Sequence, residues 1–428
     1  MQGRHVFFLL ALLFCAVMAW AQQPAVITSV DDLVRAGIQN NRDLASARAR
    51  IDEARGQVLQ AGVRPAASLD LTGATGEPLG TTGEDQYGAA VSQTLETFGK
   101  RGKRIRVAKI ALSSDEADWQ DRASQLAFEI RASFADLEAQ RQKVKVLDQL
   151  IGLNRESLRL TEARVKEGDA APLEASLLQV EISRAEVMRV SAEGRLHSAE
   201  SEVRRLSGIG LSVQLPDADP VPSISAELAD LTRRALTERP DLQSARLAEQ
   251  REIAGISLAK AEAKPDVTVS AGYSRQNSQF DGLYGFTSSG AISPIRDRMD
   301  MLNFAVSIPL RTSRSGAGNV QSAAARASGA KAHREFLEQS IPIEVEAAYQ
   351  RWKTALGSVS TMQSGVIDPS QSNLKIIQEA YKAGQLRLLD VLNQQRQLVD
   401  AQLALIDAQA DATRSWAELE RAVGGNLP

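Results

Sequence analysis

The hydrophobic pattern of the chain predicts mainly long helices. Residues 101–167 contain no proline, and apolar residues recur there at spacings of three and four, as at Ile130, Phe134 and Leu137. At 1.5 Å per residue this stretch would form a helix about 100 Å long. Its second-half counterpart, residues 317–382, contains Pro342 and Pro369, each of which we expect to kink or break the helix.

A helix of this length needs equally long partners to cover its apolar stripe. Four shorter segments also have helical patterns, and any two of them placed end to end match one long helix: 31–62, 173–208, 227–264 and 385–423. The pattern therefore predicts coiled-coil-like columns, each with one long helix packed against two short ones.

Four segments change to a period of two and predict β-strands: 66–73, 86–95, 266–276 and 301–310. Their lengths are close to the ~9–11 residues of a tilted membrane-spanning strand. One interpretation is a water-soluble four-stranded sheet with one wet face. The position of the strand pairs between helical segments, and the polar, Gly-rich loops 74–85 and 277–300, favour an outer-membrane β-barrel instead.

Four strands are too few to close a barrel, because about eight is the practical minimum. An open sheet edge in lipid would leave backbone N–H and C=O groups without partners. Several protomers must therefore share one barrel if the strands lie in a membrane. The predicted fold class is mainly α with a membrane β-barrel: a long α-helical coiled-coil barrel, plus four β-strands per protomer that contribute to a shared barrel.

Similar motifs recur in the same order in the two halves of the chain. Residues 41–44 match 239–242, and Gly168 and Glu174 match Gly384 and Asp390 at an offset of 216. We therefore expect two copies of a helix-strand-strand-helix unit, residues 22–215 and 216–428, with strands at about 66–95 and 266–310. The helix-strand junctions would lie at Pro65, Pro265 and Pro309.

The first residues predict a signal peptide, residues 1–21. Arg4 supplies a positive charge, an apolar run of signal-peptide length follows, and Ala19 and Ala21 provide small residues before a cleavage site at Gln22. The only cysteine, Cys15, lies inside this run after the bulky Phe14, so we expect no lipid anchor.

Composition and charge exclude several functions. The chain has 53 acidic and 50 basic residues, a net charge of −3, so nothing suggests a nucleic-acid partner. No catalytic motif is present, and we expect neither an enzyme nor a cofactor. His197 and His333 have no second ligand at metal-binding spacing, so we expect no metal site.

The chain resembles the TolC-like outer-membrane efflux proteins over essentially everything after the signal peptide. The resemblance rests on the Arg64-Pro65 and Lys264-Pro265 junctions, on strand ends at Leu95 and Pro309-Leu310, and above all on two motifs of residues 381–384 and 388–392. It implies a homotrimer with a twelve-stranded barrel in outer-membrane lipid and a twelve-helix periplasmic tunnel. Residues 95–101, Leu-Glu-Thr-Phe-Gly-Lys-Arg, resemble a segment of the heavy-metal cation-efflux branch.

The function that this resemblance implies is the outer-membrane channel of a tripartite efflux system. Its partners would be a periplasmic adaptor (membrane fusion) protein and a proton-driven inner-membrane pump of the resistance-nodulation-division type. The cargo stays open between metal cations, drugs and proteins of type I secretion. A secreted structural coiled-coil scaffold is the alternative from another class, but it leaves the four symmetrically placed strands unexplained.

The same resemblance predicts a periplasmic gate at the tips of two helical hairpins. Asp390 matches a position that forms an acidic constriction, Glu174 is its first-repeat equivalent, and Tyr381 matches a residue that holds closed hairpins together. Asn393 stands where the best-known members have a second acid, which weakens the case for a double acidic ring. An ordinary solvated hairpin tip is the other interpretation of these residues. Adaptor docking is predicted at the tip residues: Gly168, Ala170, Leu173, Gly384, Gln385 and Leu388.

Overall fold

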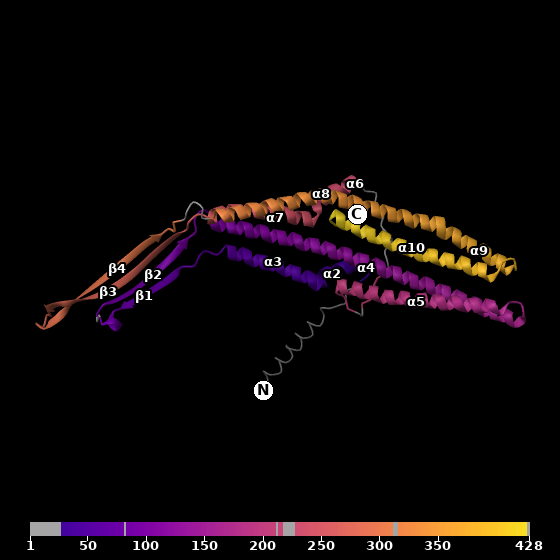
Figure 1. Cartoon of the computed structure of the whole chain (residues 1–428), viewed down its shortest axis with the longest axis horizontal. Coiled ribbons are helices and arrows are strands. Elements are labelled where there is room, and N and C mark those ends of the chain that lie inside the picture. The colour runs from indigo at the N-terminus through magenta and orange to yellow at the C-terminus, as the bar shows by residue number, and fades with distance from the viewer. Residues whose placement is uncertain (1–26, 81–82, 211–212, 217–226, 311–315, 426–428) are drawn as a thin grey trace, which may run out of the picture. The chain divides into compact units, whose positions relative to one another are not determined.

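The computed structural model describes residues 27–425, apart from 81–82, 211–212, 217–226 and 311–315. The predicted signal peptide lies outside the described residues. The helices are α2 (Val30–Asn40), α3 (Arg42–Ala61), α4 (Lys100–Glu167), α5 (Pro172–Ser207), α6 (Leu228–Glu238), α7 (Pro240–Glu262), α8 (Ala317–Met362), α9 (Asp368–Lys382) and α10 (Leu388–Val423). The strands are β1 (Ser68–Thr75), β2 (Asp85–Leu95), β3 (Val267–Phe286) and β4 (Ile292–Ser307), all visible in Figure 1. The mainly helical fold class with an antiparallel sheet is confirmed.

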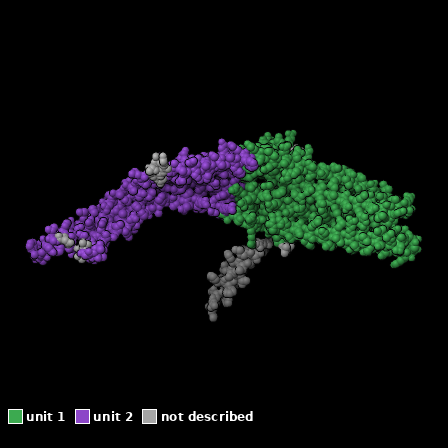
Figure 2. Space-filling view, in the orientation of Figure 1, with its two compact units in different colours: residues 1–49, 118–241, 337–428 green, residues 50–117, 242–336 purple. Residues whose placement is uncertain are grey.

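The chain divides into two compact units, coloured separately in Figure 2. Unit 1 comprises residues 1–49, 118–241 and 337–428, and unit 2 comprises residues 50–117 and 242–336. Each unit thus takes residues from both predicted repeats. The predicted division into residues 22–215 and 216–428 concerns a duplication in the sequence rather than compact units of the fold. It stays a prediction.

The core of unit 1 lies between helices rather than beneath a sheet. Its largest buried cluster joins α2, α4 and α5 through side chains that include Leu33, Ile130, Phe134, Leu137 and Val203, which are at most 3% exposed. A second region contains the Trp352 and Trp416 rings, whose centroids lie 5.5 Å apart. These contacts bury the apolar stripes that the sequence pattern places on α4, α8 and α10.

Two of the predicted helices are each divided in two. The 31–62 segment breaks at Asn41, whose Oδ1 accepts the N–H groups of Asp43 and Leu44 at 2.9 and 3.1 Å and so caps α3. Its Nδ2 also donates to the carbonyl of Leu206 at 3.0 Å. The 227–264 segment breaks at Arg239, directly before Pro240. A capping side chain and a proline therefore interrupt the two patterns at matching places.

The long helix α4 has 68 residues, close to the predicted span. In its counterpart, α8 continues through Pro342, so the break that was one of the two expected outcomes at this proline is wrong. Ile341 and Val345, both fully buried, flank this proline, and their packing offsets the lost backbone hydrogen bond. The interruption lies further along, where residues 363–367 form a π-helical segment before α9, which begins just ahead of Pro369.

The four strands form one antiparallel sheet in the order β1-β2-β3-β4. The prediction of a loop over residues 277–300 is wrong. β3 has 20 residues and β4 has 16, and the two strands continue to pair far into that segment. Leu71, Ala89, Tyr273 and Leu302 lie opposite one another across the four strands. One face therefore carries apolar side chains, and the alternate face carries residues such as Ser92, Ser270 and Thr72.

Among the described residues, no helix is long and apolar enough to cross a lipid bilayer.

Candidate gate at the helical-hairpin tips

The turn between α4 and α5 is set by one glycine. Gly168 has φ of +85°, in the left-handed region that glycine tolerates best, while a Cβ there would meet no neighbouring atom. The N–H of Asp169 donates to the carbonyl of Arg164 at 2.8 Å and closes the helix end. Ala170 and Leu173 follow at the tip, and Leu173 is 66% exposed. The chain conformation, rather than a tight contact, requires the glycine.

The turn between α9 and α10 repeats this geometry. Gly384 has φ of +74°, and the N–H of Gln385 donates to the carbonyl of Ala380 at 2.9 Å. Gln385 is exposed, whereas Leu388 is only 5% exposed and packs with Leu178 and Leu392. Leu388 therefore belongs to the core of the tip and offers no free surface of its own.

Tyr381 connects the two hairpins of one protomer. Its hydroxyl donates to Glu174 Oε2 on α5 at 3.2 Å and accepts from Arg164 Nη1 on α4 at 3.3 Å. Burial raises the pKa of the Tyr381 phenol, and the charge of Glu174 adds to this effect. The phenol therefore keeps its proton at physiological pH and can act as the donor in this contact.

Asp390 lies apart from that contact. Its Oδ2 accepts the N–H of Arg387 at 3.1 Å, within the first turn of α10, and the residue is exposed. A carboxylate at a helix N-terminus is stabilised by the helix dipole. The structure thus brings Glu174 and Tyr381 together, and it leaves the charge of Asp390 facing solvent.

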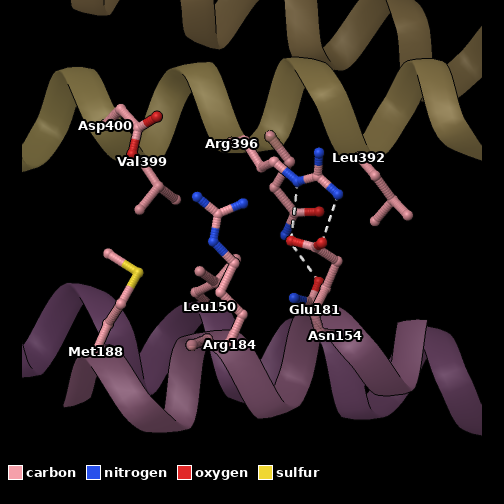
Figure 3. Close-up of a pocket in the computed structure, with 11 residues that line it drawn as sticks. Leu150, Asn154, Glu181, Arg184, Met188, Leu392, Arg396, Val399 and Asp400 are labelled. Carbon is pink, nitrogen blue, oxygen red and sulfur yellow. Dashed lines mark hydrogen bonds and ion pairs between the residues drawn. The ribbon is translucent and has the colours of Figure 1, made fainter. Parts of the chain in front are cut away.

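Deeper between the hairpins lies a polar cluster that the sequence did not reveal (Figure 3). Arg396 of α10 forms a bidentate ion pair with Glu181 of α5, one of its hydrogen bonds being 2.9 Å long. Gln395 Nε2 donates to Asn154 Oδ1 at 3.0 Å, with both residues buried. These groups border a cavity of about 30 Å³, which is large enough for a water molecule. Glu181 stands seven residues after Glu174, so heptad spacing was the signal that could have indicated it.

The junctions of helix and strand are built around residues 95–101. Thr97 Oγ1 donates to the carbonyl of Pro265 at 2.5 Å, and the buried Lys100 Nζ lies 2.8 Å from Asp266 Oδ1. Gln93 Nε2 donates to the carbonyl of Pro65 at 2.8 Å. Pro309 follows the last residue of β4 by two positions. The Leu-Glu-Thr-Phe-Gly-Lys-Arg segment therefore connects β2 to α4, and its side chains hold this connection against the residues just before β3.

His197 and His333 were expected not to bind a metal ion. His197 is exposed and lies 3.7 Å from Glu200. In the described part of the chain, no group of three or more His, Cys, Asp or Glu side chains is arranged to hold a metal ion.

The family of the chain is decided by a comparison with protein-family models. The model of the outer membrane efflux protein family matches residues 33–209 and 231–425. The chain belongs to this family. The resemblance seen in the sequence is thereby confirmed, and the protein is an outer-membrane efflux channel, a non-enzymatic component of tripartite efflux systems.

Relatives of this efflux channel are named for different compounds. The cobalt-zinc-cadmium resistance protein CzcC of Cupriavidus metallidurans is 23% identical over 392 residues, covering 90% of this chain and 87% of its own. The solvent efflux pump outer membrane protein SrpC of Pseudomonas putida is also 23% identical, covering 94% and 86%. Identity at this level does not separate metal from solvent export.

Solved structures show the same fold. The channel CusC matches with a TM-score of 0.75 at 20% identity, covering 95% of this chain and 96% of its own. The open state of the Neisseria gonorrhoeae MtrE outer membrane channel matches with a TM-score of 0.72 at 17% identity, covering 95% and 94%.

Proposed function

We propose that this efflux channel works as a homotrimer that conducts metal cations from a periplasmic adaptor protein and an inner-membrane pump to the exterior. The proposal of a trimer is supported by the edges and the apolar face of the sheet. In the part of the chain that the structure describes, the two outer strands, β1 and β4, each have one unpaired edge. The apolar face of the sheet is exposed, with Phe304 79% and Leu71 73% accessible. In lipid, such edges must pair with other copies of the chain.

Three protomers of four strands give twelve strands, which exceeds the minimum for closure. The helices would then form the periplasmic tunnel. We also propose that residues 22–215 and 216–428 are two copies of one unit. The identical order of helix, helix, strand, strand, long helix in each half supports this, as do the two separate stretches that match the family.

The hairpin tips would form the gate of this tunnel. Tyr381–Glu174 and Arg396–Glu181 hold the two hairpins of one protomer together. Asp390 has an exposed carboxylate, and three copies around a narrow opening would concentrate negative charge and favour cations. The exposed tip residues Leu173 and Gln385 and the partly exposed Ala170, beside the turns at Gly168 and Gly384, would dock the adaptor.

The metal cargo is supported by the relation to CzcC, whose name states cobalt, zinc and cadmium, and by the resemblance of residues 95–101. The partner pump would be of the resistance-nodulation-division type. The test is deletion of the gene, followed by growth on zinc, cobalt and cadmium salts and, separately, on toluene. We expect sensitivity to the metals only. Sensitivity to toluene alone would replace the metal cargo with solvents, as for SrpC.

A further inference from the structure

The apolar face of the sheet ends at a row of tyrosines. On β1 and β4 the side chains of Leu69, Leu71, Leu302 and Phe304 are 64–79% exposed. Along β2 and β3 the apolar positions end at Tyr87 and Tyr273, which are 55% and 42% exposed. Val267 and Tyr273 are separated by about 20 Å along the strand at ~3.3 Å per residue. This is comparable with the ~25 Å apolar band of an outer-membrane barrel, which ends in an aromatic girdle.

Three arginines continue this same face beyond the tyrosines. Arg275 stands two residues after Tyr273 and lies opposite Tyr87 and Asp300. On β4, Arg298 and Arg296 lie opposite Asn277 and Gln279, two and four residues from Asp300. Alternate residues of a strand share a face, so all three guanidinium groups are on the side of Leu302 and Phe304.

The local charges hold these arginines in place without neutralising them. Asp300 lies 2.7 Å from Arg275 Nε and 3.7 Å from Arg298 Nε, and it also accepts the Tyr273 hydroxyl at 2.5 Å. Arg296 Nε donates to Gln279 at 3.2 Å, and Arg298 remains 64% exposed. Asp85, opposite Asn277, is the other acid that the described register places on this face here. Three guanidinium groups thus face two carboxylates.

We propose that Arg275, Arg296 and Arg298 bind the phosphate groups of phosphorylated glycolipids in the outer leaflet. The proposal rests on the proposed function, in which the sheet spans the outer membrane. The β3–β4 hairpin end is the part of unit 2 farthest from its helices (Figure 1), so the arginines lie toward the exterior leaflet. An arginine fork matches phosphate bidentately, and the adjacent apolar face would contact the acyl chains of the same lipid.

The test uses the double variant Arg296→Gln/Arg298→Gln, which removes two exposed charges and leaves the Arg275–Asp300 pair intact. A control, Arg35→Gln/Arg233→Gln, removes the same charge from exposed helical positions. Each purified full-length protein is placed in phosphatidylethanolamine nanodiscs with diphosphorylated lipid A or with lipid A lacking both phosphates. The number of lipid A molecules that stay bound to each protein is measured by mass spectrometry.

We expect the wild type and the control to retain the phosphorylated form about tenfold better, and the double variant to lose most of that preference. Equal retention of the two lipids by the wild type, or an unchanged preference in the double variant, would overturn the lipid site. Planar-bilayer conductance separates this from the proposed function. Normal conductance without lipid preference contradicts the lipid site alone, whereas a wild-type protein that never inserts contradicts the membrane location and the lipid site together.

Discussion

At the residue scale, a few side chains connect the two hairpins of a protomer, and their roles follow from burial. Glu181 is 9% exposed and accepts hydrogen bonds from two nitrogens of Arg396. Asp390 is exposed and accepts the N–H of Arg387 at its own helix end. Glu181 can therefore hold α5 and α10 together, and the carboxylate of Asp390 is available to an ion. The sequence indicated Glu174, Tyr381 and Asp390 through resemblance. It did not indicate Glu181 or Arg396, because charged residues on long helices usually face solvent.

Substitution of Asp390 by Asn should weaken cation selectivity. It removes one negative charge per protomer, three per trimer, from the opening while retaining a hydrogen-bond acceptor for the Arg387 N–H. Reversal potentials of single channels in a salt gradient measure the change, and we expect the cation preference to fall at least several-fold. Asp169→Asn, at the other tip, is a control of equal charge. An unchanged reversal potential would exclude an Asp390 ring.

The double variant Tyr381→Phe/Arg396→Gln should favour the open tunnel. It removes two of the contacts between the hairpins, Tyr381–Glu174 and Arg396–Glu181. Because Arg396 is 37% exposed, the loss is about 1–2 kcal/mol, less than for a fully buried pair. The open population should rise about tenfold, measured as single-channel conductance. Arg155→Gln breaks an ion pair between α4 and α5 inside one hairpin and is the control. Closed-like conductance in the double variant would show that other contacts hold the tips.

Asp121 should make stability depend on pH. Burial is the main cause that raises the pKa of this carboxyl above 3.8, and Asp241 adds to it. The folded state therefore favours the protonated form, so the stabilisation is complete below pH 3.8 and is lost as the pH rises through the raised pKa. Asp121→Asn should raise the Tm at pH 7 by about 1–3 °C and leave it unchanged at pH 3. Glu116→Gln, an exposed carboxyl on the same helix, is the control. Equal Tm values of the Asp121 variant and the wild type at both pH values would contradict this account.

At the scale of elements, the period of the hydrophobic pattern predicted type better than extent. The 68-residue α4 follows from an unbroken pattern without proline. The outer halves of β3 and β4 were missed because polar residues such as Asn277, Arg298 and Asp300 replace the apolar members of the alternation there. Pro342 was expected to kink or break α8, but the helix is continuous there and the neighbours Ile341 and Val345 are buried. Packing between elements, which one sequence does not display, decided these cases.

The two hairpin turns should be needed for adaptor docking rather than for assembly. Leu173→Glu places a charge on a side chain that is 66% exposed at the tip of α5. We expect loss of export while trimers persist, because an adaptor surface that accepts an apolar side chain would have to desolvate the carboxylate. Export assays and unheated gel migration measure the two properties. Ile343→Glu, equally exposed on α8 but outside the tips, is the control; normal export by Leu173→Glu would place docking elsewhere.

At the scale of the whole molecule, membership of the family identifies the chain as an outer-membrane efflux channel. The sheet explains why one chain would not be enough to form a closed barrel. The described residues of a protomer form a sheet of four strands with two unpaired edges and an exposed apolar face. The apolar face suits lipid, but the unpaired edges of a lone copy would leave backbone N–H and C=O groups without partners there. Assembly is therefore the step on which both the conduit and its gate depend.

Native mass spectrometry of the detergent-solubilised full-length protein tests this assembly most directly. We predict one dominant species with the mass of three mature chains, which disappears on heating and is insoluble without detergent. A monomer that stays soluble in water without detergent would contradict the shared barrel, and with it the tunnel and the gate.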